Sequence, residues 1–128
     1  MAKLFILDDQ KIRHELFEIR YKDHDIVSAY TATEAITALE ESDFDYIFLD
    51  HDLGLQVYTV SNENSGYEVA KWISENYKNV NVRIIIHSFN PVGANNMLHV
   101  LFDAGFKNII SVPFPCNGYG PIKIKDKR

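Results

Sequence analysis

Acidic side chains follow two separate apolar runs of this chain, and such groups hold metal ions when a fold brings them together. Asp8 and Asp9 come directly after the run KLFIL. Asp50 and Asp52 come after the run YIFL. Carboxylates within a few ångströms of one another repel, and burying them without a partner is costly. A hard divalent cation such as Mg²⁺ or Mn²⁺ removes that cost, because it prefers oxygen ligands and keeps waters that a phosphate can replace.

A histidine and a serine follow a third apolar run, RIII, and their chemistry suits work on a phosphate. His87 can transfer a proton near neutral pH. Ser88 and Asn90 can bind phosphate oxygens, and the helix expected after this polar turn presents N-terminal N–H groups that attract anions. His51, which directly follows Asp50, has an undetermined role, because in extended backbone the two side chains point to opposite faces.

Each of these groups also has an ordinary structural explanation. The aspartates can cap the helices that follow them, as Asp commonly does. A histidine at a strand end is often buried with its hydrogen bonds satisfied, and asparagine is common in turns. Acidic residues after two separate strands favour the metal interpretation, because both sets would meet at one edge of the sheet. The remaining histidines, His14, His24 and His99, are expected on helix or turn surfaces without a function.

Composition narrows the class of protein. The chain has 128 residues, 46% of them hydrophobic, which suits one packed domain. A net charge of −5 argues against an extensive nucleic-acid footprint. No apolar run approaches the roughly 18 residues of a membrane span, so no membrane association is expected. The single cysteine, Cys116, and the lack of a basic and apolar leader predict a cytoplasmic protein.

The periodicity of apolar residues predicts strands that alternate with helices. Strands are expected at residues 3–7, 26–27, 45–49, 82–86 and 108–112, and helices at 11–21, 31–41, 66–76 and 95–104. Thr31 and Glu34 form a capping box, and Met97 and Phe102 are expected to face the core. Alternating strands and helices predict βαβ units and a parallel sheet. Ligands of such sheets bind beyond the carboxyl ends of the strands, which is where the polar side chains described above come.

Several of these segments resemble the receiver domains of response regulators. FILDDQKIR resembles their first strand and acidic pair, YIFLD resembles the strand that ends in their phosphoacceptor, here Asp50, and IIIHS places Ser88 where receivers keep a Thr or Ser. DAGFKNIISVPF resembles their last turn and strand. The resemblance covers about residues 3–114 and implies a flavodoxin-like α/β fold, a doubly wound parallel five-stranded sheet of order 2-1-3-4-5. It divides the chain into a receiver-like domain at 1–114 and a non-helical tail at 115–128, with the last helix missing.

The chain departs from the receiver pattern at one functional position and matches a divergent subgroup better. Receivers carry a lysine just before the proline near the end of the domain, where this chain has Val112, and Lys107 comes too early to replace it. DHDLG and HSFNPVGANNM resemble the motifs of the cyclic-phosphate processing receiver domains. The name of that subgroup implies action on a cyclic phosphate.

Three hypotheses of function stay open. The first is a metal-dependent phosphoesterase that opens a cyclic phosphate, either a 2′,3′-cyclic end or a cyclic nucleotide, so that its partner would be a phosphorylated small molecule or an RNA end. The second is a receiver that is phosphorylated on Asp50 in a phosphorelay and switches a protein partner. The third is a module that binds a ligand or partner without turnover. The residues assigned to the first are, for the metal, Asp8, Asp9, Asp50 and Asp52, for catalysis, Asp50, His87 and Asp52, and for the phosphate, Ser88 and Asn90.

Overall fold

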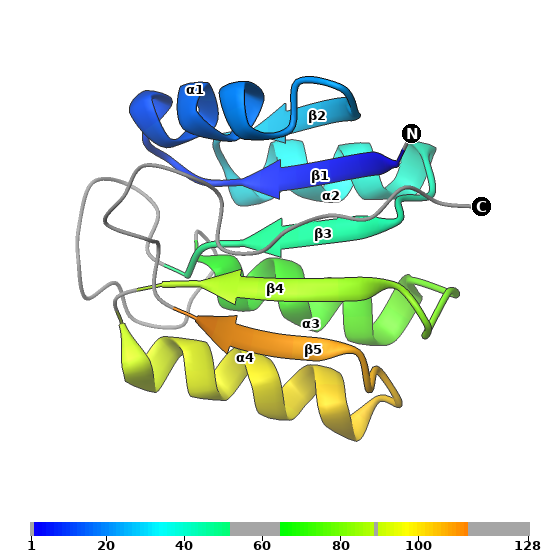
Figure 1. Ribbon diagram of the computed structural model, residues 1–128. Coiled ribbons are helices and arrows are strands. Elements are labelled where there is room, and N and C mark those ends of the chain that lie inside the picture. Colours follow the sequence, from blue (N-terminus) through cyan, green and yellow to red (C-terminus); the bar gives the residue numbers. More distant parts are fainter. Residues whose placement is uncertain (1, 52–64, 89, 113–128) are drawn as a thin grey trace.

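Five parallel strands alternate with four helices in the part of the chain that the computed structural model describes, residues 2–51, 65–88 and 90–112 (Figure 1). In chain order the elements are β1 (Lys3–Leu7), α1 (Lys11–Arg20), β2 (Asp25–Ala29), α2 (Ala32–Glu41), β3 (Tyr46–Leu49), α3 (Gly66–Asn76), β4 (Arg83–His87), α4 (Pro91–Asp103) and β5 (Ile109–Val112). The strand order is β2-β1-β3-β4-β5, and each neighbouring pair runs parallel. The predicted doubly wound α/β fold of order 2-1-3-4-5 is confirmed.

Helices pack on both faces of the sheet, as is usual for parallel sheets. Helix α1 packs on one face, here called the α1 face, and α2, α3 and α4 pack on the opposite one, called the α4 face (Figure 1). The fully buried side chains of the α1 face include Leu4, Ile6, Phe17, Phe48 and Ile85. Those of the α4 face include Phe5, Leu7, Ile47, Leu49, Ile84 and Ile86. The continuous apolar runs of the sequence follow from this burial on both sides.

Strand alternation decides which polar residues meet. Side chains two positions apart in a strand lie on the same face, so Asp8, Asp50 and His87 continue the rows that hold Ile6, Phe48 and Ile85 on the α1 face. The register of the central strands aligns these rows, because Leu7 pairs with Leu49 and Leu49 pairs with Ile86. The carboxyl ends of β1, β3 and β4 therefore deliver two carboxylates and an imidazole to one place.

Side chains cap the N-termini of α2 and α4. The predicted capping box is present at α2, where the Thr31 hydroxyl accepts a hydrogen bond from the Glu34 N–H at 3.1 Å. The Glu34 carboxylate accepts one from the N–H of Tyr30 at 2.8 Å, so the box closes on the residue before the N-cap Thr31. Helix α4 begins at Pro91 rather than at residue 95, because Asn90 caps it and a proline suits the first helical position.

Two predicted side-chain environments are wrong. The sequence pattern predicts Phe102 in the core, but half of its surface is exposed, and the ammonium group of Lys107 lies 4.4 Å from the centre of its ring. The sequence pattern predicts His14 on a surface, but only 2% of it is exposed, because it lies with Phe17 on the side of α1 that faces the sheet. One residue of error in the assumed helix face turns a side chain by about 100° and explains such differences.

Some predictions lie outside the described residues. These are the domain boundary at 114, the non-helical tail at 115–128 with the missing last helix, and the metal and catalytic roles of Asp52. Among the described helices, none combines the length and the apolar character needed to cross a lipid bilayer.

Candidate functional site

Three carboxylates gather at the carboxyl ends of β1 and β3. Asp8, Asp9 and Asp50 each offer an oxygen, and these three oxygens all lie within 4.8 Å of one another. Asp8 is fully buried and Asp50 is 4% exposed, while Asp9 is half-buried. Three oxygen ligands at this spacing, with one side open to solvent at Asp9, fit a hard divalent cation. These three residues would hold the metal predicted from the sequence.

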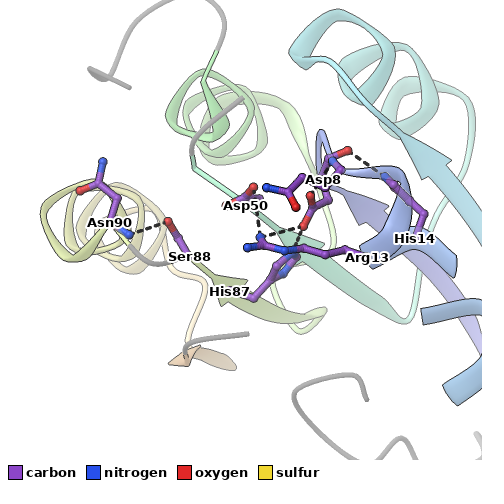
Figure 2. A network of polar contacts seen from close by, with 8 residues as sticks. Asp8, Arg13, His14, Asp50, His87, Ser88 and Asn90 are labelled. Carbon is purple, nitrogen blue, oxygen red and sulfur yellow. Dashed lines mark hydrogen bonds and ion pairs between the residues drawn. The ribbon is translucent and has the colours of Figure 1, made fainter. Parts of the chain in front are cut away.

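Asp8 accepts hydrogen bonds through both of its carboxylate oxygens (Figure 2). Its Oδ2 accepts a hydrogen bond from His87 Nε2 at 3.1 Å, and its Oδ1 accepts one from the N–H of Gln10 at 2.9 Å. Burial raises the pKa of this carboxyl, but the hydrogen bond from His87, the charge of Arg13 and the Gln10 N–H outweigh it and lower the pKa overall. Asp8 is therefore a carboxylate at neutral pH.

His87 supports Asp8 from inside the protein. Its side chain is completely buried, and the centre of its ring lies 5.4 Å from the ring centre of Phe17 and 6.4 Å from that of Phe48. Burial lowers the pKa of His87 in spite of the nearby Asp8 carboxylate. The ring is thus neutral at pH 7, and Nε2 carries the hydrogen that it donates to Asp8. This geometry supports a positioning role, while the predicted role in proton transfer stays a prediction.

Arg13 is a member of the site that the sequence analysis missed. Its Nη1 lies 3.3 Å from Oδ2 of Asp8 and 3.7 Å from Oδ2 of Asp50 (Figure 2). The side chain is 13% exposed and comes from the first turn of α1. One feature of the sequence could have indicated this role of Arg13: it is a basic residue about one helical turn after Asp9. A long side chain at that position can reach back over the end of β1.

His14 fixes the backbone of the same strand exit. Its Nε2 lies 2.8 Å from the carbonyl oxygen of Asp8, which can only accept, so Nε2 is the donor. The ring centre lies 4.2 Å from that of Tyr30, which follows β2. His14 therefore ties α1 and the end of β2 to the carbonyl of a proposed metal ligand.

Gly66 lets α3 begin directly against the end of β3. Its N–H donates a hydrogen bond to the carbonyl of His51 at 2.8 Å. A Cβ at this position would overlap the carbonyl oxygen of Asp50. The glycine after Ser65 is thus required by close packing behind the Asp50 backbone.

His51 lies on the opposite side of the sheet from Asp50. Its Nδ1 is 3.4 Å from Nδ2 of Asn90, and a Cβ at Gly93 would overlap its ring. Asn90 Nδ2 is the donor, because Asn90 Oδ1 already accepts from the N–H of Gly93 at 3.0 Å. The structure therefore places His51 as a packing residue between β3 and the first turn of α4, in keeping with the alternation of an extended chain.

Ser88 and Asn90 group beside α4, to one side of the carboxylates (Figure 2). The Ser88 hydroxyl accepts a hydrogen bond from the N–H of Asn90 at 3.1 Å. Ser88 also lines a pocket of about 360 Å³ together with Pro91, Asn95 and Val112. The Asn90 amide bonds to the Gly93 N–H and to the His51 ring. The phosphate-binding roles of Asn90 and Ser88 stay predictions.

Val112 occupies the position on β5 that pairs with His87. The residue there is apolar, and Lys107, the basic residue before β5, lies over the ring of Phe102. The positive charge that the structure places beside Asp8 and Asp50 comes from α1 instead, through Arg13.

Comparison with known families and structures is consistent with this geometry. The model of the family described as the cyclic-phosphate processing receiver domain matches residues 3–103. A comparison with curated proteins finds no match.

Solved receiver structures share the fold. The signal receiver domain of a putative LuxO repressor protein from Vibrio parahaemolyticus aligns with a TM-score of 0.61 and 24% identity over 91% of this chain and 82% of that one. The phosphorylated cyanobacterial phytochrome response regulator RcpA aligns with a TM-score of 0.63 and 19% identity over 91% and 83%. The Mn²⁺-bound form of response regulator Rcp1 aligns with a TM-score of 0.66 and 16% identity over 91% and 84%. At these identities the likeness establishes the fold.

Proposed function

The chain belongs to the family of cyclic-phosphate processing receiver domains, and on that premise we propose that it is a phosphorylatable receiver in which Asp50 accepts a phosphoryl group and a protein partner responds. The observation that carries this proposal is the placement of Asp50. Its carboxylate lies at the end of the central strand β3, within 4.8 Å of two further carboxylates and 3.7 Å from the Arg13 guanidinium. A nucleophilic carboxylate between metal ligands and a guanidinium suits phosphoryl transfer.

The proposed metal ligands are Asp8, Asp9 and Asp50. Among the solved relatives, Rcp1 is described with bound Mn²⁺ and RcpA as phosphorylated, which supports Mg²⁺ or Mn²⁺ here. When bound, such a cation supplies positive charge to the oxygens of a transferring phosphoryl group. This chain's own residues hold the ligands ready for it, since His87 and the Gln10 N–H fix the Asp8 carboxylate.

The proposed reaction is transfer from an acyl phosphate such as acetyl phosphate. One Asp50 carboxylate oxygen forms a bond to phosphorus, while the bond from phosphorus to the acyl oxygen breaks and its electron pair leaves on acetate. The backbone keeps the nucleophile in place, because the N–H of Asp50 donates to the carbonyl of Leu7 at 3.1 Å. Arg13 Nη1 lies 3.7 Å from Oδ2, one of the two Asp50 oxygens available to the new group.

The test is intact-protein mass spectrometry after incubation with acetyl phosphate and Mg²⁺. We expect the wild-type chain to gain the mass of one phosphoryl group, and Asp50→Asn to gain none. The matched control is Asp103→Asn, an exposed aspartate at the end of α4 that should leave phosphorylation unchanged. A wild-type chain that gains no phosphoryl group, or an Asp50→Asn chain that gains as much as the wild type, would refute the proposal.

A second candidate function, hydrolysis of a cyclic phosphate, is favoured by the family description alone. The same three carboxylates would bind the metal, and a metal-bound water would be the nucleophile in place of Asp50. Incubation with 2′,3′-cyclic nucleotides and cyclic-ended RNA oligomers, with Mg²⁺ or Mn²⁺, separates the two. Opening of any of these substrates by the wild type but not by Asp50→Asn would favour the enzyme.

A further inference from the structure

We infer that Arg13 is a second cation of this site, which binds the phosphoryl group on Asp50 and opposes the binding of a divalent metal. The inference rests on the proposed function for its phosphoryl part, while its metal part stands on the geometry of the described residues. Arg13 Nη1 lies within 3.3 Å of one proposed metal ligand and 3.7 Å of another. It therefore contacts carboxylates that a metal would also have to bind.

The formal charges explain the opposition to the metal. The three clustered carboxylates carry three negative charges, and Arg13 contributes one positive charge beside two of them. Removal of the Arg13 charge would leave a divalent cation facing the full charge of the three carboxylates, and it should then bind more tightly, because charges this close in a partly buried site are weakly screened.

Phosphorylation changes this balance in favour of Arg13. A phosphoryl group on Asp50 replaces one negative charge with about two. A positive charge beside Asp50 is therefore attracted more strongly once Asp50 is phosphorylated. A guanidinium presents several N–H donors in a planar fork that matches phosphoryl oxygens, which a lysine ammonium does not do.

The surroundings hold Arg13 in reach of Asp50. Its backbone N–H donates to the carbonyl of Gln10 at 3.1 Å, in the first turn of α1. Two neighbours on the same helix fix the helix itself, because His14 bonds to the Asp8 carbonyl and Phe17 is fully buried in the core. The base of the Arg13 side chain is therefore anchored, and its head group extends to the carboxylates (Figure 2).

The test compares Arg13→Gln and Arg13→Lys with the wild type by calorimetry, with Mg²⁺ alone and then with beryllofluoride at saturating Mg²⁺. For Arg13→Gln we expect Mg²⁺ binding about three- to tenfold tighter and beryllofluoride binding about tenfold weaker or more. Arg13→Lys keeps the charge but loses the fork, so Mg²⁺ affinity should stay within about twofold and beryllofluoride affinity should still fall. The matched control is Lys11→Gln, which removes an exposed charge from the same helical turn.

An arginine with only a structural role would not shift the Mg²⁺ affinity and the beryllofluoride affinity in opposite directions. If Arg13→Gln matches Lys11→Gln in both affinities, the inference is overturned. If the wild type binds Mg²⁺ but no beryllofluoride, the proposed function fails while the Mg²⁺ comparison still decides the metal part. If Arg13→Gln does not fold, as judged by circular dichroism, Arg13→Lys decides the phosphoryl part, and an unchanged beryllofluoride affinity would overturn it.

Discussion

On the α1 face, Asp8, Asp50 and His87 converge with an arginine around a charged cluster, whereas on the α4 face His51 and Asn90 are used to seat a helix. Both groups include a residue that directly follows β3, Asp50 on the α1 face and His51 on the α4 face. Asp50 and His51 are neighbours just after β3, and their side chains point to opposite faces of the sheet because successive residues of an extended chain alternate. Strand alternation therefore separates the residues proposed for chemistry from the residues that pack.

This comparison predicts two kinds of variant. Changes on the α1 face should alter metal binding, while changes on the α4 face should alter stability and leave metal binding alone.

The largest effect is expected at Asp8. Asp8→Asn keeps the shape of the side chain but removes a charge and a ligand oxygen, so Mg²⁺ binding should weaken by about 100-fold, the upper end of the losses seen for changes around metal ligands. Calorimetric titration with Mg²⁺ measures this, with Asp103→Asn as the control. An Asp8→Asn chain whose dissociation constant stays near that of the wild type would show that the cluster is not the metal site.

On the α4 face, a smaller effect, on stability alone, is expected at Gly93. A Cβ there would overlap the buried ring of His51, so Gly93→Ala should lower the free energy of unfolding by about 2 kcal/mol. Its Mg²⁺ affinity should not change. Urea denaturation and calorimetry measure the two quantities.

The double variant His51→Ala, Gly93→Ala sharpens this prediction. Without the imidazole the clash disappears, so Gly93→Ala should cost less than about 0.5 kcal/mol in that background. A full penalty in both backgrounds would mean that the glycine is needed for another reason.

The smallest effect is a pH dependence of stability that comes from the α1 face. Burial lowers the pKa of His87 below 6.5, so the native ring stays neutral while the unfolded chain takes up a proton. The unfolded state then binds more protons, and the free energy of unfolding falls as the pH drops below 6.5, by up to about 1.4 kcal/mol per pH unit. Denaturation at about pH 6.5 and about pH 5.5 should show this loss in the wild type and less of it in His87→Gln. Equal losses in both proteins would exclude His87 as the source.

The sequence predicts the fold well because each element carries its own signal. Continuous apolar runs predict strands that are buried on both faces, and Thr31 with Glu34 predicts the start of α2. The meeting of Asp8 with Asp50 was also predictable, since the carboxyl ends of parallel strands share one edge. These features depend on local pattern and on topology alone.

The remaining features depend on side-chain directions that spacing does not define. Arg13 enters the site from a helix, and its reach depends on how α1 is rotated against the sheet. The same rotation buries His14, while that of α4 exposes Phe102. Such rotations are set by packing between elements, which a local sequence pattern does not record.

The most direct test of the central claim is a crystal structure of the protein with Mn²⁺ and beryllofluoride, with the ion located by its anomalous scattering. We expect an anomalous peak among the carboxylates of Asp8, Asp9 and Asp50, with beryllofluoride on an Asp50 oxygen and the Arg13 guanidinium against its fluorides. A crystal that shows no anomalous peak at these carboxylates at millimolar Mn²⁺, or beryllofluoride bound elsewhere, would refute the proposed metal and phosphoryl site.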